Sequence, residues 1–360
     1  MLLGIDEYPF HQITAPFAAT ATSDAQWNDG HYLCFADAAG TVGAATSLRL
    51  YPNNDVLDGF VCVRHDGKQY NLRLSRRLRP DLETIGVGPL RLELLEPMQA
   101  VRLVLGPNDI GIELDITCRS TAVPYLDPVE VTRVDGRLVS ERITYEVVGT
   151  CTGWVSVAGE RIELDAPRDA FFRNHSWGVH PGRGGPRNYA APKPGDGQRV
   201  PGIRHWVLFT MPDHGGFFFT DPSGRKASGK GGVLYPDRQV PVASVEPSVE
   251  FYEGGRRLRG GSFRFTDYAG DTRTYRVEDL GWVYCQGGGY FGGFDDGLGQ
   301  GVYRGDLHSE GEVWDVTHPT LIRAADGREF EFDHAWAESF VRLTCDGKQG
   351  LAHYECVVIG

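Results

Sequence analysis

Apolar and polar residues alternate over many short stretches of this 360-residue chain. A period of two is typical of β-strands that bury one face, and it runs through residues 47–51, 61–64, 69–74, 90–95, 101–105 and 110–116. Asp66-Gly67 and Asp135-Gly136 lie between such stretches and are typical of two-residue hairpin turns. Very little of the chain has the period of 3.6 expected of helices. The pattern therefore predicts an all-β protein with antiparallel strands in a sandwich or barrel.

The second half of the chain repeats this style. Further strands are expected at 206–210, 216–220, 262–266, 274–277 and 353–358. The segment 181–202 separates the halves, and 11 of its 22 residues are glycine or proline. Such a stretch is typical of a linker or of a lid. We expect an N-terminal domain over 1–180, a loop or lid over 181–202, and a C-terminal domain over 203–360.

Composition narrows the classes of function. Hydrophobic residues make up 41% of the chain, which is enough for a large core, and the net charge of −12 disfavours nucleic acid as a partner. The first residues lack the basic start of a signal peptide, and no stretch reaches the roughly 18 apolar residues that span a membrane. The seven cysteines are odd in number and never spaced C-x-x-C, so free thiols and a cytoplasmic location are expected.

One short stretch concentrates hydrogen-bonding side chains. Residues 173–178 read Arg173-Asn174-His175-Ser176-Trp177-Gly178. On a strand, His175 and Trp177 face one side while Asn174 and Ser176 face the other. Histidine is the side chain best suited to exchange protons near neutral pH. The alternative is a core histidine bonded to the backbone beside a core tryptophan.

These six residues resemble a known motif, Arg-Asp-His-Ser-Trp-Gly. Many bacterial members of the carotenoid hydratase (hydroxyneurosporene synthase)-like family and its AttH-like relatives carry it. Residues 143–159 and 287–319 also resemble segments of that family. The resemblance implies two lipocalin-like antiparallel β-barrel domains in tandem, with an apolar pocket near the motif. It also implies cofactor-free chemistry on lipophilic substrates, such as adding water to an alkene or cyclisation.

One position departs from the family motif. The family's aspartate is Asn174 here, and an amide can orient a group but cannot shuttle a proton. Proton transfer then falls to His175 or to a carboxylate elsewhere, such as Asp169 or Glu146.

Several other residues are candidates for binding the substrate. Tyr284 and Tyr290 lie in or beside a glycine- and aromatic-rich segment, where aromatic faces could contact a ligand or simply fill a core. His205 precedes a tryptophan and follows the 181–202 segment. The remaining candidates are Tyr303 and His318. For each residue a structural role is the alternative.

No cofactor is expected from the sequence. The histidines and cysteines lack the spacing of a metal site, and no phosphate loop or dinucleotide fingerprint follows a strand.

Together, these observations predict a cofactor-independent acid/base enzyme of lyase or hydratase type, with its site at the junction of the two domains. His175 would transfer the proton, Asn174 and Arg173 would orient it or bind a substrate oxygen, and Trp177 would form the wall of the pocket. The expected partner is a small lipophilic or aromatic substrate, and a homodimer is possible. The alternatives are an isomerase or cyclase, a carrier of a small lipophile, and a carbohydrate-active β-sandwich.

Overall fold

The computed structural model describes residues 1–7, 9, 11, 14–180, 182–184, 201–222, 230–331 and 337–359. Within these ranges the regular structure is antiparallel strands and three short 3-10 helices, η1 (Gly4–Glu7), η2 (Cys285–Gly288) and η3 (Tyr290–Gly292). The all-β class predicted from the sequence is therefore confirmed.

A sheet of 15 strands contains the first half of the chain. Its strands are β1 (Trp27–Ala36), β2 (Val42–Tyr51), β3 (Val56–His65), β4 (Lys68–Arg77), β5 (Gly86–Val87), β6 (Leu90–Glu96), β7 (Ala100–Leu105), β8 (Ile112–Ser120), β9 (Tyr125–Val134), β10 (Arg137–Val157), β11 (Glu160–Leu164), β12 (Ala170–Val179), β19 (Leu307–Asp315), β20 (Leu321–Ala324) and β21 (Glu329–Glu331). The hydrogen-bonded path is open, with β21 at one end and β5 at the other. We call this the first sheet.

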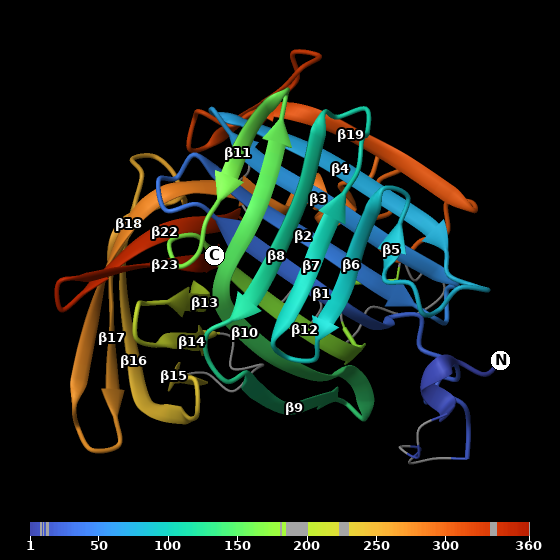
Figure 1. The fold of residues 1–360 in the computed structure, drawn as a ribbon, viewed down its shortest axis with the longest axis horizontal. Coiled ribbons are helices and arrows are strands. Elements are labelled where there is room, and N and C mark those ends of the chain that lie inside the picture. Colours follow the sequence, from blue (N-terminus) through green and yellow to red (C-terminus); the bar gives the residue numbers. More distant parts are fainter. Residues whose placement is uncertain are drawn as a thin grey trace.

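The first sheet bends strongly, so that β6–β8 pass in front of β1–β4 (Figure 1). The two layers touch where Gly59 of β3 meets Val87 and Leu90, because a Cβ on Gly59 would come within 2.8 Å of the Val87 side chain. The enclosed space is filled by an apolar core to which all these strands contribute, including Phe35, Leu72 and others. This inner core explains the alternating sequence of β6–β8, whose outward-facing residues are partly or fully exposed.

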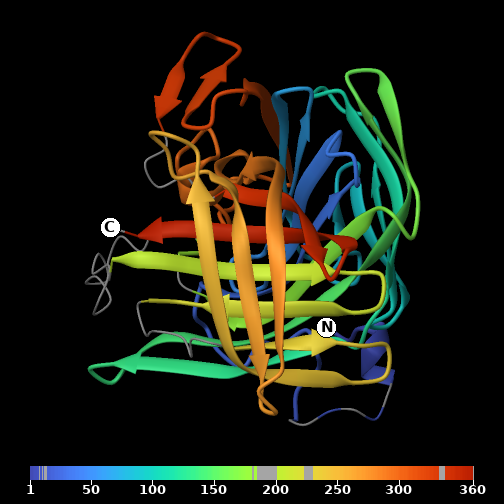
Figure 2. The same cartoon turned by 90° about the vertical axis from the view of Figure 1, so that its left-hand side faces the viewer.

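The second half of the chain closes into a barrel of eight antiparallel strands (Figure 2). They are β13 (Gly202–Thr210), β14 (Gly215–Thr220), β15 (Lys230–Leu234), β16 (Gln239–Phe251), β17 (Leu258–Asp267), β18 (Thr272–Tyr284), β22 (Ala337–Cys345) and β23 (Lys348–Ile359). Strands adjacent in the chain are mostly adjacent in the barrel, and β23 pairs with β13 to close it, as in a lipocalin-like barrel. Packed aromatic rings fill its interior, among them Phe209, Phe263 and Tyr275.

A third apolar core lies between the first sheet and the barrel, and we call this region the junction. It combines Phe60 and Phe172 of the first sheet with Leu208 and Phe340 of the barrel. Strand β1 is consequently buried on both faces, one in the inner core and one at the junction. The central strands of the first sheet, including the strand that carries the motif, therefore have one face in the inner core and the other at the junction.

The strand pairing crosses the division expected from the sequence at residue 203. β19 pairs with β4 over Leu307–Asp315, and β20 and β21 continue the first sheet from there. An uncovered β4 would present a row of unpaired backbone groups, and β19 satisfies them. The segment 203–360 thus supplies both the barrel and one edge of the first sheet.

The hairpin turns expected from the sequence are present. Asp66 and Gly67 both have positive φ, 46° and 69°, and so do Asp135 and Gly136 at 49° and 77°. This is the conformation of the turn that suits the twist of paired strands, and Asp-Gly favours it. Most of the expected lid over 181–202 lies outside the described residues. No helix in the described part of the chain has the length and apolar character needed to cross a membrane.

Candidate active site

The motif lies on β12, between β1 and β10 in the first sheet. His175 is directly opposite His31 of β1 and Tyr145 of β10. Odd-numbered residues of β12 face the inner core and even-numbered residues face the junction. His175 and Trp177 therefore share one face while Asn174 and Ser176 share the other, as the sequence pattern predicts.

On the inner face, His175 lies between a carboxylate and a phenol. Its Nε2 is 2.8 Å from Oδ1 of Asp29, and its Nδ1 is 3.1 Å from the hydroxyl of Tyr145. A carboxylate can only accept, so in the neutral imidazole the proton resides on Nε2 and Nδ1 accepts from the Tyr145 hydroxyl. The side chains of His175 and Asp29 are 21% and 41% exposed, so this arrangement lies at the rim of the inner core.

A second histidine stacks on the first. The rings of His31 and His175 are 4.0 Å apart, centroid to centroid, and the Trp177 ring lies 5.1 Å from His175. Burial lowers the pKa of His31 well below its usual range, and the neighbouring His175 and Arg173 lower it further. His31 is thus a neutral imidazole, and its buried Nδ1 has no hydrogen-bond partner among the described residues.

Arg173 completes the inner-face group. Its side chain is directed into the inner core, its residue is only 2% exposed, and its guanidinium carbon lies 5.8 Å from the centre of the Tyr145 ring. Its Nε has no hydrogen-bond partner in the described part of the chain, and burial lowers the pKa of the guanidinium. We call Asp29, His31, Tyr145, Arg173 and His175 the inner-face cluster.

On the junction face, Asn174 contacts a buried carboxyl group. Its Nδ2 donates to Oε1 of Glu146 at 2.9 Å, and Trp206 Nε1 of the barrel donates to the same oxygen at 3.2 Å. Glu146 is 1% exposed and its Oε2 has no partner among the described residues. Burial, reinforced by Asp127, raises the pKa of Glu146 to about 8.

Other polar groups line the junction beyond Trp206. The His353 ring is 4.9 Å from the Trp206 ring, and its Nε2 contacts Oε2 of Glu338. The Cys285 thiol donates to Oε1 of Glu338 at 3.2 Å. Burial opposes both charges, but contact with His353 lowers the pKa of Glu338, and contact with Cys34 and Glu338 raises that of His353. This buried ion pair links β22 to β23 on the side of the barrel that faces the first sheet.

The motif therefore serves two separate environments. Because β12 lies between them, His175 and Asn174 cannot contact the same small substrate atom. The site expected at the junction of the domains includes Asn174 but not His175, whose side chain points into the first sheet. Ser176, also on the junction face, accepts hydrogen bonds from Arg49 Nη1 and Nη2 at its carbonyl and hydroxyl, both at 3.2 Å.

The six residues expected to bind substrate do not converge. Trp177 belongs beside the inner-face cluster, and Tyr290 lies at the junction, 5.8 Å from Phe60. His205 points into the barrel and contacts the Tyr354 hydroxyl at 3.1 Å. The other three lie elsewhere: Tyr284 among the apolar residues around Trp282, Tyr303 on the surface beside Arg77, and His318 in an exposed turn beside Thr320.

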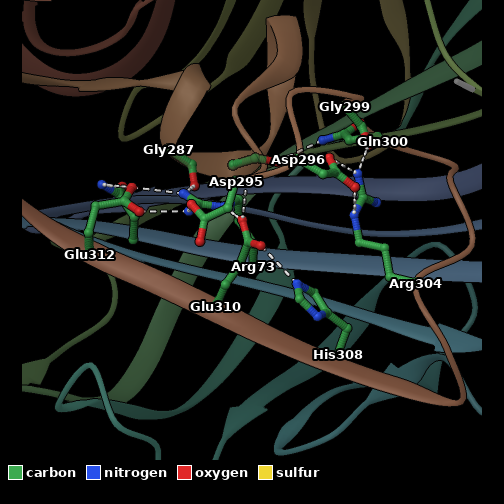
Figure 3. A network of polar contacts seen from close by, with 12 residues as sticks. Arg73, Gly287, Asp295, Asp296, Gly299, Gln300, Arg304, His308, Glu310 and Glu312 are labelled. Atoms are coloured by element: carbon green, nitrogen blue, oxygen red, sulfur yellow. Dashed lines mark hydrogen bonds and ion pairs between the residues drawn. The ribbon is translucent and has the colours of Figure 1, made fainter. Parts of the chain in front are cut away.

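The glycine-rich segment before Tyr303 is anchored to the first sheet by ion pairs (Figure 3). Arg73, 1% exposed, donates to the carboxylates of Glu310 and Glu312 at 2.6–2.8 Å and to the Gly287 carbonyl at 3.1 Å. Arg304 closes the other end by bonding Asp296. Glycines 287 and 288 lie where a Cβ would collide with Asn71 and Phe60. The ion pairs and this close packing give the segment a structural role.

Asp169, one of the two carboxylates considered from the sequence, is a structural group. Its carboxylate accepts hydrogen bonds from the backbone N–H of Ala38 at 2.9 Å and of Asp165 at 2.7 Å. It therefore ties the start of β12 to neighbouring turns. Glu146, the other, is the one that contacts the motif.

Sequence reasoning missed Asp29, His31 and Tyr145. Asp29 and His31 come from Asn28-Asp-Gly-His31 in an otherwise apolar strand, and residues two apart on a strand share a face. That local signal was available, but nothing local shows that the strand lies beside the motif.

No three or more His, Cys, Asp or Glu side chains within the described ranges are grouped as a metal site would require. All seven cysteines are buried and none forms a disulfide.

No curated protein matches the chain. Similar solved structures include kievitone hydratase from Nectria haematococca, at 11% identity and a TM-score of 0.47, covering 94% of this chain and 93% of that one. CghA with Sch210972 has 8% identity and a TM-score of 0.49, covering 93% and 89% of the two chains. A second structure of CghA has 7% identity and a TM-score of 0.47, covering 93% of this chain and 88% of that one.

The resemblance of residues 173–178 to the carotenoid hydratase-like motif stays a prediction. At family level, the match extends over residues 2–360, and the chain belongs to the family described as "Family of unknown function (DUF8625)".

Proposed function

We propose that this chain is a cofactor-independent acid/base enzyme of lyase or hydratase type, acting on a small lipophilic or aromatic substrate at the inner-face cluster. The observation that carries the proposal is the position of His175 between Asp29 Oδ1 at 2.8 Å and the Tyr145 hydroxyl at 3.1 Å. A base held by a carboxylate on one nitrogen and bonded to a hydroxyl on the other is a recurring arrangement for moving protons.

The arrangement supports a reversible elimination of water. Tyr145 transfers its proton to Nδ1 of His175 as its oxygen takes a proton from a substrate carbon. Asp29 stabilises the imidazolium that forms, and Arg173 stabilises the negative charge on the substrate. The carbon–oxygen bond then breaks, the leaving hydroxide takes the Tyr145 proton, and His175 returns its proton to Tyr145. The products are an alkene and water, and the protein groups are restored; hydration is the reverse.

An isomerase or cyclase would use the same groups, since proton removal and return are common to all three reactions. The products differ in mass: elimination or hydration changes the mass of the substrate by one water, whereas isomerisation and cyclisation leave it unchanged. A carrier would bind its ligand and leave it unaltered.

The test is an untargeted metabolite screen with purified protein, followed by mass spectrometry of any compound that is consumed. His175→Gln keeps hydrogen bonding but not proton exchange, so turnover should fall by about 10²–10⁴-fold. His318→Gln, in an exposed turn, is the control and should keep full turnover. Near-full turnover in His175→Gln would refute the proposal.

A further inference from the structure

Arg173 is a buried cation without a visible counterion. The residue is 2% exposed, and no carboxylate among the described residues lies within ion-pair distance of it. Within the same described ranges, its Nε lacks a hydrogen-bond partner. The titratable groups that interact electrostatically with its guanidinium are Tyr145 and Cys118, and both are neutral at ordinary pH. A buried, unpaired charge is costly, so such a group calls for an explanation.

Arg49 shows what a structural arginine looks like in the same sheet. It is 5% exposed, close to the value for Arg173. Its Nε, like that of Arg173, has no hydrogen-bond partner among the described residues. Its two terminal nitrogens, however, make four hydrogen bonds, to Asn28, to the Gly30 carbonyl, and to the carbonyl and hydroxyl of Ser176. Arg49 thus ties β2 to β1 and β12, whereas the described residues make no comparable hydrogen bonds with Arg173.

His31 offers a second unused polar atom beside Arg173. Its Nδ1 is buried and has no hydrogen-bond partner among the residues that the structure describes, and the proximity of Arg173 contributes to lowering its pKa. A neutral imidazole protonated at Nδ1 donates one hydrogen bond. The two residues lie on adjacent strands, since Arg173 is opposite Leu33 and His175 is opposite His31. Together they offer the donors that a carboxylate requires.

We propose that Arg173 and His31 bind the carboxylate of an organic acid, so that the substrate class is a lipophilic or aromatic carboxylic acid. As a statement about substrate, this rests on the proposed function. Arg173 lies beside the Tyr145 ring, so a bound carboxylate directs the carbons next to it toward the Tyr145 hydroxyl. The carbon adjacent to a carboxylate is the one whose proton is removed in the elimination, and the Arg173 charge favours the resulting anion.

The first experiment compares stability without ligand. Arg173→Met removes an unpaired buried charge and keeps much of the volume, so Tm should rise by at least about 2 °C. Arg49→Met, the matched control, removes four hydrogen bonds and should lower Tm. A fall in Tm for Arg173→Met comparable to that for Arg49→Met would overturn the proposal, because Arg173 would then be structural.

The second experiment measures binding by isothermal titration calorimetry with three pairs of probes: benzoate and benzamide, cinnamate and cinnamamide, octanoate and octanamide. The unaltered protein should bind at least one carboxylate at least 10-fold more tightly than its amide. Arg173→Met should lose that preference, Arg173→Lys should keep part of it, and His175→Gln should keep all of it. No preference for any carboxylate in the unaltered protein would overturn the proposal.

The two proposals fail separately. If His175→Gln keeps its turnover but the carboxylate preference depends on Arg173, the binding site stands and the assigned chemistry falls. If turnover depends on His175 but no carboxylate is preferred, the chemistry stands and the substrate class is wrong.

Discussion

Asn174 donates a hydrogen bond to Oε1 of Glu146 across the pair of strands β12 and β10, at a distance of 2.9 Å. Trp206 donates to the same oxygen. The proton of the neutral carboxyl group is therefore directed to Oε2, which has no partner among the described residues. An aspartate at 174 would set two carboxyl groups against each other in a buried site. The amide therefore fits its neighbour, which gives a physical reason for asparagine rather than aspartate at this position.

Glu146 should make the protein less stable as pH rises. Its pKa is raised by burial to about 8, above its ordinary value of 4.5, so between these values the folded state binds more protons than the unfolded state. The free energy of unfolding therefore falls as pH rises from about 4.5 to 8. Glu146→Gln should remove this dependence and be more stable than the unaltered protein at pH 8.5, as measured by urea unfolding across pH.

The matched control is Glu163→Gln, whose side chain is 65% exposed and which should leave the pH profile unchanged. An unaltered profile in Glu146→Gln would mean that the carboxyl group is ionised in the folded protein at neutral pH.

Asp29 should fix the tautomer of His175. In the unaltered protein, nitrogen chemical shifts should report a proton on Nε2 of the neutral ring, because the carboxylate 2.8 Å away only accepts. Asp29→Asn can present either a donor or an acceptor, so the preference should weaken and turnover should fall by about 10²–10⁴-fold. Detection of the Nδ1-protonated form in the unaltered protein would contradict the proton pathway proposed here.

Arg73 should be essential for stability. Removing it takes the guanidinium away from the carboxylates of Glu310 and Glu312, which it contacts at 2.6–2.8 Å, and breaking such a buried pair typically costs about 3–5 kcal/mol. Arg73→Met should show this loss in urea unfolding. Arg264→Met is the control: its partner Glu246 and Arg264 itself are 56% and 52% exposed, and an exposed pair contributes about 0–1 kcal/mol. Equal losses in the two variants would show that the network does not hold the glycine-rich segment.

Gly287 should not tolerate a side chain. An added Cβ would lie 2.1 Å from Oδ1 of Asn71, and overpacking of this kind typically costs about 1–3 kcal/mol. Gly106→Ala is the matched control, since its nearest neighbour would be Pro89 at 3.7 Å, and it should change stability by less than about 0.5 kcal/mol. Thermal unfolding of both variants checks this, and a stable Gly287→Ala would show that the segment can shift.

Local sequence patterns correctly predicted the turn types and the two faces of the strands. The turn at Asp66-Gly67 has the two positive φ values that this pair favours, and the two faces of β12 follow directly from alternation. Glu146 was among the carboxylates considered from the sequence, and it does contact the motif.

Long-range pairing was not readable from the chain. Asp29 meets His175 across 146 residues, and Arg73 meets Glu310 across 237. No local period encodes which strands become neighbours. For the same reason, alternation could not reveal that the junction and the inner core lie on opposite sides of the motif.

The pairing of β19 with β4 also has a consequence for biosynthesis. As the chain emerges from the ribosome, one edge of β4 stays unpaired until more than 230 further residues have been made. Unpaired strand edges can bind strands from other molecules. The natural partner of β4 arrives only after most of the barrel has been translated. A nascent chain stalled before residue 307 should therefore need a chaperone, and a truncation that keeps only the first half should aggregate.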